Sequence, residues 1–333
     1  MRDFFGRELN YVRISVTDRC NYRCRYCMPE GGVDWIAHDK ILSYENILFL
    51  IGILCDLGIK KIRFTGGEPL IRKGMIPFLE NVTASFPNLQ VALTSNGSTL
   101  TQHAAHLARI GLKSVNISLD TLDAEKFSVM TRGASLEPVL DGIDALTSLV
   151  SRTQTEVKMN AVLIRGFNND DDMIGRLTDF AFKRGIILRF IEFMPLHSDL
   201  WSAETFVPFS EVFAALARLG RADSWIEDPE ENTLSGPARY YVNSVTGWRI
   251  GVISAISRHF CGTCNRLRVS STGGIRPCLF DGAQIFLAEA IRNHDGEKVR
   301  ELLQEAVSIK PGSGTAHYEA VRRDETHMHT IGG

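Results

Sequence analysis

The sequence lacks a long hydrophobic run. Its longest apolar stretch, residues 47–55, ends at Asp56, whereas a helix that crosses a membrane needs about 20 apolar residues. The first eight residues mix acidic and basic side chains, unlike a signal peptide. We therefore expect a cytoplasmic protein with no membrane partner.

Charge of one sign is also scarce, since 37 Lys and Arg residues face 39 Asp and Glu residues. This balance excludes a general binder of nucleic acid, so any phosphate group must meet a local basic cluster in a cleft. The chain has no internal repeat and no Walker A motif, because Leu112 separates the glycine and lysine of the nearest candidate, residues 111–114. A nucleoside triphosphate must therefore bind through side chains.

Residues 1–194 alternate between short β-branched or aromatic runs and helical patterns, which is typical of βα units and a parallel sheet. Six strands are predicted, at residues 11–17, 61–65, 90–95, 114–119, 156–163 and 187–193. Helices are predicted at 45–57 after Ser43 and at 100–110 before Gly111, with Pro138 opening another and Gly185 closing the next. The fold class is therefore α/β, either a partial barrel or an open doubly wound sheet.

Four prolines interrupt residues 195–237, which show little periodicity and are interpreted as a connecting region. Two hairpins follow, one around Thr246-Gly247 and one around residues 271–274. Helices near 284–292 and 297–306 complete a smaller C-terminal α+β layer. By composition alone, the end of the chain reads as a loose polar tail.

Six of the seven cysteines form two groups of three, Cys20, Cys24 and Cys27 after the first strand, and Cys261, Cys264 and Cys278 in the C-terminal layer. In a reducing compartment such groups are more often metal ligands than disulfides. A structural zinc site closes with four ligands, whereas an iron-sulfur cube bound by three thiolates leaves one iron open. Zinc completed by a residue such as His259 remains an alternative. Cys55 lies in an apolar helix and is interpreted as an inert thiol.

The first triplet, with Tyr26 inside it and Gly66-Gly67-Glu68-Pro69 at the end of the second strand, resembles the radical S-adenosylmethionine (SAM) superfamily. The resemblance implies a 4Fe-4S cluster whose open iron binds the amino acid end of SAM. Paired glycines at a strand end also let backbone groups approach a ligand. The implied SAM contacts are Tyr26, Gly67, Ser118 and Met194.

Residues 260–268, Arg276-Pro277-Cys278 and the terminal Gly332-Gly333 resemble the GTP 3′,8-cyclase family of molybdenum cofactor biosynthesis, as do residues 6–20. The resemblance implies a partial (β/α)6 barrel of the radical SAM type over residues 1–235, and a C-terminal region, 236–333, with a second 4Fe-4S cluster that faces GTP. The implied GTP contacts are Arg13, Arg63, Thr94, Lys158, Arg189, Arg266, Leu267, Arg268 and Arg276. Gly332 and Gly333 are implied as catalytic residues on a tail that enters the barrel.

Arg266 and Arg268 are two apart on a predicted strand, so both point to one face, where guanidinium groups bind phosphate in bidentate fashion. The position of Arg276 and Cys278 depends on the length of the hairpin loop that follows this strand. A three-residue loop with Gly274 in the left-handed conformation places both residues on the same face as Arg266 and Arg268, whereas a loop of two or four residues does not.

The implied activity is conversion of GTP to 3′,8-cyclo-7,8-dihydro-GTP, with SAM and two 4Fe-4S clusters as cofactors. An electron donor and the next enzyme of the pathway are the implied partners. One alternative is a radical SAM enzyme that acts on another substrate, such as a peptide, and a second is a zinc-binding interaction protein. The arginines between the cluster cysteines favour a phosphate-rich substrate.

Overall fold

The computed structural model describes residues 1–151, 153–196, 200–221, 225–228, 236–280 and 282–313. The strands are β1 (Tyr11–Ser15), β2 (Lys61–Thr65), β3 (Gln90–Ser95), β4 (Ser114–Ser118), β5 (Glu156–Leu163), β6 (Ile187–Glu192), β7 (Trp225–Glu227), β8 (Arg239–Asn243), β9 (Arg249–Ile253), β10 (Arg266–Val269), β11 (Gly274–Arg276) and β12 (Ile285–Phe286). The helices are α1 (Tyr44–Asp56), α2 (Met75–Ser85), α3 (Leu100–Ile110), α4 (Ala124–Thr131), α5 (Glu137–Val150), α6 (Asp171–Lys183), α7 (Ser210–Arg218), α8 (Ala288–Arg292) and α9 (Gly296–Ser308). All six predicted strands are confirmed.

Local capping signals explain where several helices begin and end. The Ser43 side chain accepts a hydrogen bond from the backbone N–H of Asn46 at 3.2 Å, which caps α1. Gly111 is left-handed directly after α3, and Gly185 has a φ of 67° just beyond α6. Pro138 lies in the first turn of α5, where its missing N–H costs nothing.

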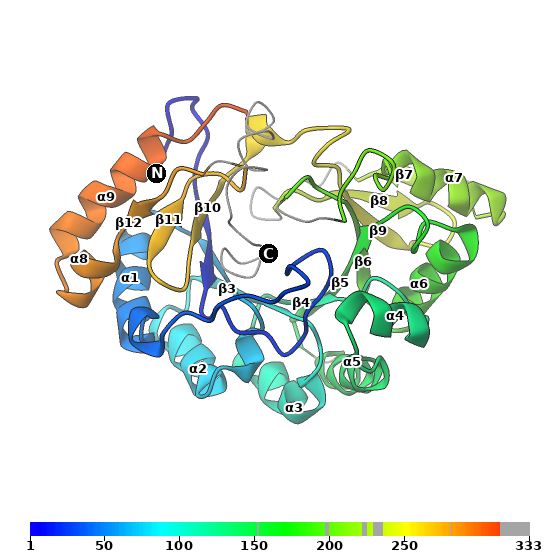
Figure 1. Ribbon diagram of the computed structural model, residues 1–333, viewed down its shortest axis with the longest axis horizontal. Coiled ribbons are helices and arrows are strands. Elements are labelled where there is room, and N and C mark those ends of the chain that lie inside the picture. The colour runs from blue at the N-terminus through cyan, green and yellow to red at the C-terminus, as the bar shows by residue number, and fades with distance from the viewer. Residues whose placement is uncertain (152, 197–199, 222–224, 229–235, 281, 314–333) are drawn as a thin grey trace.

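The strands of the described residues form one sheet, in the order β12-β11-β10-β1-β2-β3-β4-β5-β6-β9-β8-β7. Strands β1 to β6 are parallel and follow chain order, β10 joins β1 in parallel, and β9 joins β6 in parallel. Figure 1 shows this sheet curving around a central space, with the helices on its outside. The partial barrel is therefore confirmed, and the C-terminal α+β region lengthens it at both edges.

The structure corrects three predictions. The supposed connecting region contains α7 and β7, and α7 buries Val212, Ala215 and Leu216 at helical spacing. The first hairpin closes through Asn243 and Trp248, whose N–H to carbonyl bond of 2.8 Å encloses four residues rather than two. The predicted helix near 284–292 begins only at α8, because its first residues form β12.

Helices α8 and α9 pack against α1, and α9 also contacts β11 and β12. The predicted domain boundary at residue 235 falls outside the described residues, so it remains a prediction. No helix in the described part of the chain is long and apolar enough to cross a membrane.

Candidate active site

Side chains alternate between the two faces of the curved sheet, because successive residues of a strand point to opposite sides. The outward residues are apolar and pack under the helices, as Val12 and Ile14 of β1 do. The inward residues are mostly polar or charged and surround one cavity. Strand residues that line it are Tyr11, Arg13, Arg63, Thr65, Thr94, Ser95, Asn116, Ser118, Asn160, Val162, Arg189, Ile191, Ile253, Arg266 and Arg268. The strands therefore bring polar and charged groups into the lumen.

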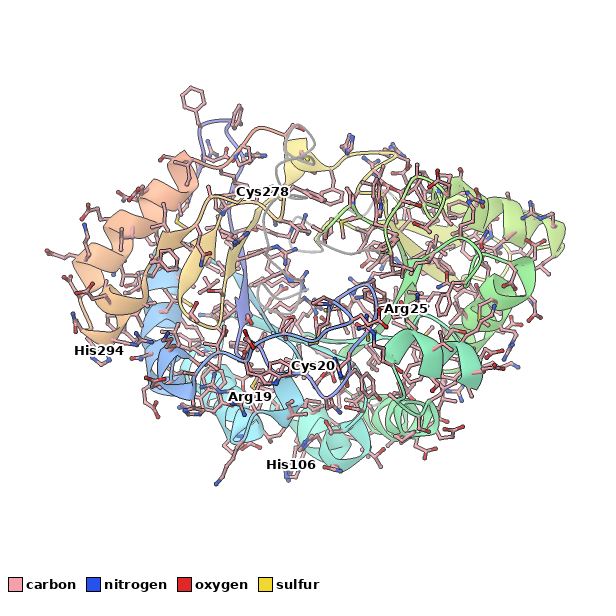
Figure 2. The ribbon with its side chains drawn as sticks, viewed as in Figure 1. Arg19, Cys20, Arg25, His106, Cys278 and His294 are labelled. Carbon is pink, nitrogen blue, oxygen red and sulfur yellow. The ribbon has the colours of Figure 1, made fainter. Side chains whose placement is uncertain are left out.

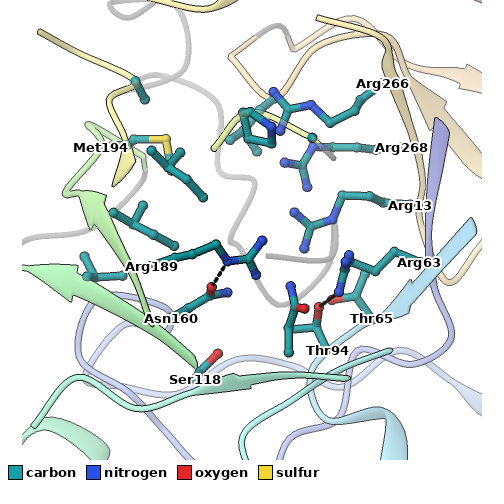
Figure 3. A pocket seen from close by; sticks show the side chains of 18 of the residues that line it. Arg13, Arg63, Thr65, Thr94, Ser118, Asn160, Arg189, Met194, Arg266 and Arg268 are labelled. Atoms are coloured by element: carbon teal, nitrogen blue, oxygen red, sulfur yellow. Dashed lines mark hydrogen bonds between the residues drawn. The ribbon is translucent and has the colours of Figure 1, made fainter. Parts of the chain in front are cut away.

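Five arginines of the strands converge on this cavity, and Arg7 lines it as well. Figure 3 shows Arg266, Arg268, Arg13 and Arg63 extending from β10, β1 and β2 toward the space that Arg189 enters from β6. Arg63 donates to the hydroxyl of Tyr11 at 2.7 Å, and Arg189 donates to Oδ1 of Asn160 at 2.9 Å. Among the described lining residues Asp120 is the one acid, whereas seven are Arg or Lys.

Burial, together with the charge of neighbouring arginines, lowers the pKa values of Arg13 and Arg268. Burial lowers the pKa of Arg268 to about 10, and the nearby charge of Arg266 adds to the effect. Burial and the charge of Arg268 hold the pKa of Arg13 well below its usual value. A buried cluster of like charges is costly without a counter-charge. The cavity is thus suited to a polyanion such as a triphosphate.

The first cysteine triplet lies on the loop after β1, where Figure 2 labels Cys20, and all three thiols line the cavity. The backbone N–H groups of Cys27 and Met28 donate to the carbonyl of Cys24 at 2.9 and 3.0 Å. Arg132 fixes the loop from outside by donating to the carbonyls of Arg23 and Met28 at 2.8 and 3.0 Å. Burial, followed by the neighbouring Cys27, raises the pKa of Cys24 well above its usual value.

Three such thiols fit a 4Fe-4S cluster, because a bound cation would offset the cost of ionising grouped, buried sulfurs. No three His, Cys, Asp or Glu side chains of the described chain gather closely enough to share a single metal ion. A 4Fe-4S cube binds each thiolate at a different corner, so its ligands need not lie as close together as the ligands of a single metal ion.

The paired glycines after β2 have a role that the sequence alone did not show. A Cβ atom at Gly66 would overlap the carbonyl oxygen of Thr17, and one at Gly67 would overlap that of Arg19. The loop before Cys20 therefore packs directly on this turn. The N–H of Gly67 donates to Thr17 at 2.8 Å, so the turn fixes the start of the cysteine loop.

Glu68 of the same turn joins the ends of β2 and β3. Its carboxylate accepts hydrogen bonds from the N–H of Leu70 at 3.0 Å, the hydroxyl of Ser95 at 3.0 Å and the N–H of Asn96 at 2.6 Å. Burial raises the pKa of Glu68 to about 7, although these bonds act in the other direction.

The predicted SAM contacts Tyr26, Gly67, Ser118 and Met194 all line the cavity. The Tyr26 hydroxyl donates to Oδ2 of Asp120 at 2.8 Å, and Oδ1 of Asp120 accepts from the N–H of Val162 at 2.8 Å. This pairing orients the tyrosine beside the first triplet.

The second triplet lies on the same cavity, with Cys261 and Cys264 before β10 and Cys278 after β11. Sγ of Cys264 accepts from Nη2 of Arg266 at 3.6 Å and from Nζ of Lys310 at 3.8 Å. Burial raises the pKa of Cys264, but these two charges outweigh it and lower the pKa to about 6. The surroundings thus favour the thiolate at Cys264, whereas burial raises the pKa of Cys278, and a bound cluster would offset the cost of ionising Cys278.

His259, the candidate for a fourth zinc ligand, is not among the lining residues. Its Nδ1 lies 2.7 Å from the carbonyl oxygen of Ala255.

The second hairpin has the three-residue loop among the alternatives considered, since the N–H of Ser270 donates to the carbonyl of Gly274 at 2.8 Å. The left-handed glycine is Gly273, with a φ of 86°, rather than Gly274. Arg276 therefore lies directly opposite Arg268. It is buried but outside the lining residues, and its Nη2 donates to Oε1 of Gln284 at 3.4 Å.

Two further predicted GTP contacts lie away from the cavity. The Leu267 side chain is fully buried in the hydrophobic core on the outward face of β10, so it faces away from the cavity, and a contact of Leu267 with GTP remains a prediction. Lys158 is not a lining residue, and it pairs with Glu156 at 2.9 Å near the start of β5. Gly332 and Gly333 lie outside the described residues.

The cavity also contains polar residues that had not been predicted from the sequence. Asn116 and Asn160 share the inward face with Ser118, and the two-residue period of their strands was the available signal. Lys310 lines the cavity as well, and no local pattern indicated it.

Comparisons with known proteins agree with this geometry. Residues 14–177 match the Radical SAM superfamily, and residues 186–315 match the family described as Molybdenum Cofactor Synthesis C. A GTP 3′,8-cyclase from Pelotomaculum thermopropionicum is 41% identical over 337 residues, covering 100% of both chains. One from Geobacter sulfurreducens is 41% identical over 313 residues, covering 93% of this chain and 92% of its own.

Two solved structures share the fold at low identity. Streptococcus suis SuiB bound to precursor peptide SuiA has a TM-score of 0.62 and 14% identity, covering 96% of this chain and 68% of SuiB. Native anSMEcpe with bound AdoMet has a TM-score of 0.54 and 16% identity, covering 90% of this chain and 84% of its own. From its full-length similarity to the cyclases, the chain belongs to the GTP 3′,8-cyclase family of the radical SAM superfamily.

Proposed function

We propose that this chain converts GTP to 3′,8-cyclo-7,8-dihydro-GTP, the first step of molybdenum cofactor biosynthesis. The observation that carries the proposal is that two cysteine triplets and six arginines line one cavity. The triplets supply sulfur ligands for two clusters, and the arginines supply charge for a triphosphate. Membership of the cyclase family supports the same reading.

Cys20, Cys24 and Cys27 hold the first 4Fe-4S cluster, and SAM lies against Tyr26, Gly67, Ser118 and Met194. When bound, this cluster supplies the electron that splits SAM into methionine and a 5′-deoxyadenosyl radical. The packed glycine turn and the Tyr26 to Asp120 bond keep the SAM side of the cavity in place.

GTP occupies the rest of the cavity. Arg13, Arg63, Arg189, Arg266 and Arg268, with Thr94, bind it, while Cys261, Cys264 and Cys278 would hold the second cluster. SAM bound at the first cluster would supply the means of removing the hydrogen on ribose C3′, so that C3′ would then bond to C8 of guanine. A further electron from the electron donor and a proton would complete the product. The chain contributes positioning and the exclusion of water.

Gly332 and Gly333 are proposed to enter the barrel mouth at the end of the tail. Pro311, near the end of the described residues, lines the cavity, which supports this proposal. Only glycine approaches a ligand closely and adopts positive φ at little cost. Deleting both residues should leave iron content and SAM binding near normal but stop hydrogen abstraction from GTP. Product at the wild-type rate would exclude the tail from catalysis.

The proposed partners follow from the reaction. An electron donor must reduce the first cluster, and the next enzyme of the pathway receives the product. We place both encounters in the cytoplasm.

The test is an anaerobic incubation of the reconstituted protein with reductant, SAM and GTP. GTP-dependent formation of 5′-deoxyadenosine and of the cyclised nucleotide is expected, with about eight irons per chain for two clusters. Zinc in place of iron, or 5′-deoxyadenosine formation that GTP does not affect, would contradict the proposal.

A further inference from the structure

Lys310 is a buried lysine at the second cysteine triplet, and the proposed function gives it no role. The residue is 3% exposed. Its ammonium group donates to the carbonyl oxygens of Arg266 at 2.9 Å and Pro277 at 2.6 Å, and to Sγ of Cys264 at 3.8 Å. An ammonium has three N–H donors, so these three acceptors use all of them.

The charge of Lys310 needs a partner, because an unpaired buried ammonium is strongly unfavourable. Among the residues that the structure describes, no carboxylate lies within ion-pair distance of its Nζ. The nearest group able to carry negative charge is the Cys264 sulfur. A cluster bound by three thiolates would place the missing negative charge there.

Lys310 also connects the separate segments that carry the cysteines. Arg266 lies two residues after Cys264, and Pro277 directly precedes Cys278, so one ammonium holds both segments. Next to it, Arg7 donates to the carbonyls of Cys261 and Pro311, each at 2.7 Å. The stretch from Lys310 to Pro311 is therefore tied to all three ligand segments.

We propose that Lys310 is a positioning residue of the second cluster, which donates an N–H to the Cys264 sulfur, supplies its counter-charge and raises the cluster's reduction potential. Hydrogen bonds to ligand sulfurs and local net charge are the levers by which a protein sets such a potential. The inference rests on the proposed function, because it requires a cluster at this triplet.

The test starts from a parent variant in which Cys20, Cys24 and Cys27 are all alanine, so that remaining iron reports on the second site. Iron and sulfide content, the EPR spectrum of the reduced cluster and its midpoint potential are measured. Lys310→Met, which removes the charge and the donors, should shift the midpoint to a more negative potential and alter the spectrum. Lys310→Arg should bring both back toward the parent. Lys298→Met, on the exposed face of α9, is the matched control and should change neither.

The possible outcomes separate the existence of the second cluster from the role of Lys310. A parent variant without iron would overturn the second cluster and the proposed function with it. A Lys310→Met variant that keeps its cluster with the parent's potential and spectrum would overturn only this inference. If Lys310→Met loses the cluster, recovery in Lys310→Arg supports the charge role. Loss in both variants would assign Lys310 to packing and overturn the proposal.

Discussion

The two cysteine triplets offer the same ligands in different surroundings. Sγ of Cys20 accepts from neutral groups, the N–H of Tyr22 at 3.4 Å and the amide of Asn96 at 3.6 Å. Sγ of Cys264 accepts from two cations, Arg266 and Lys310.

This contrast appears in the thiol pKa values. Burial raises the pKa of Cys20 to about 11, whereas at Cys264 the cations outweigh burial and bring the pKa to about 6. Cluster properties depend on hydrogen bonds and net charge around the sulfurs as well as on the ligands themselves. The two triplets therefore differ in the charge placed beside one ligand, with two cations at Cys264 and neutral donors at Cys20.

Breaking the first site should have the largest effect. Cys24→Ala should abolish reductive cleavage of SAM, because two thiolates cannot hold the cube with a defined open iron. The measurement is 5′-deoxyadenosine formed with dithionite under anaerobic conditions. Iron content should fall by about half, since the second site keeps its ligands. Retained SAM cleavage would show that Cys24 is not a ligand.

Breaking the second site should spare the first. Cys264→Ala should weaken or misplace GTP while the first cluster remains reducible and able to cleave SAM. Product formation and uncoupled 5′-deoxyadenosine are measured side by side, with Cys55→Ala, a thiol in α1 outside the cavity, as the control. Cyclisation at a normal rate would make the second triplet structural.

Removing one arginine between the sites should have a moderate effect. Arg268→Ala removes a charge-assisted contact of about 1.5–3 kcal/mol, or about 10- to 150-fold in GTP affinity or turnover. SAM binding should barely change. Arg109→Ala is the control, because Arg109 is exposed in the last turn of α3 and does not line the cavity. Equal losses for GTP and SAM would identify Arg268 as a folding residue.

The smallest expected effect concerns the pH dependence of the first site. The pKa of Glu68 is raised from 4.5 to about 7 in the folded state, so the folded protein binds this proton more tightly than the unfolded chain. The resulting stability is fully present below pH 4.5 and is lost as pH rises through about 7. Glu68→Gln should flatten that slope in denaturant unfolding across this window. An unchanged slope would show that Glu68 ionises normally in the folded protein.

Much of the fold and part of the site could be predicted locally. The alternation of strands and helices, the caps at Ser43 and Gly111 and the spacing of both triplets depend on neighbours a few residues apart. The same two-residue period that put Arg266 and Arg268 on one face also puts Leu267 on the other. The sequence therefore already indicated that the Leu267 side chain points away from the cavity, whereas its contact with GTP remains a prediction.

Other features depended on contacts between distant segments. The sequence by itself determined which residues make strands, helices and cysteine groups, because those signals are short-range. Only the tertiary structure decided that β9 and β10 join opposite edges of the barrel and that the glycine turn packs under the cysteine loop. It also decided that Lys310 reaches Cys264 across 46 residues of chain. Such contacts arise when strands pair and buried charges find partners during folding, and no local pattern encodes which distant group they meet.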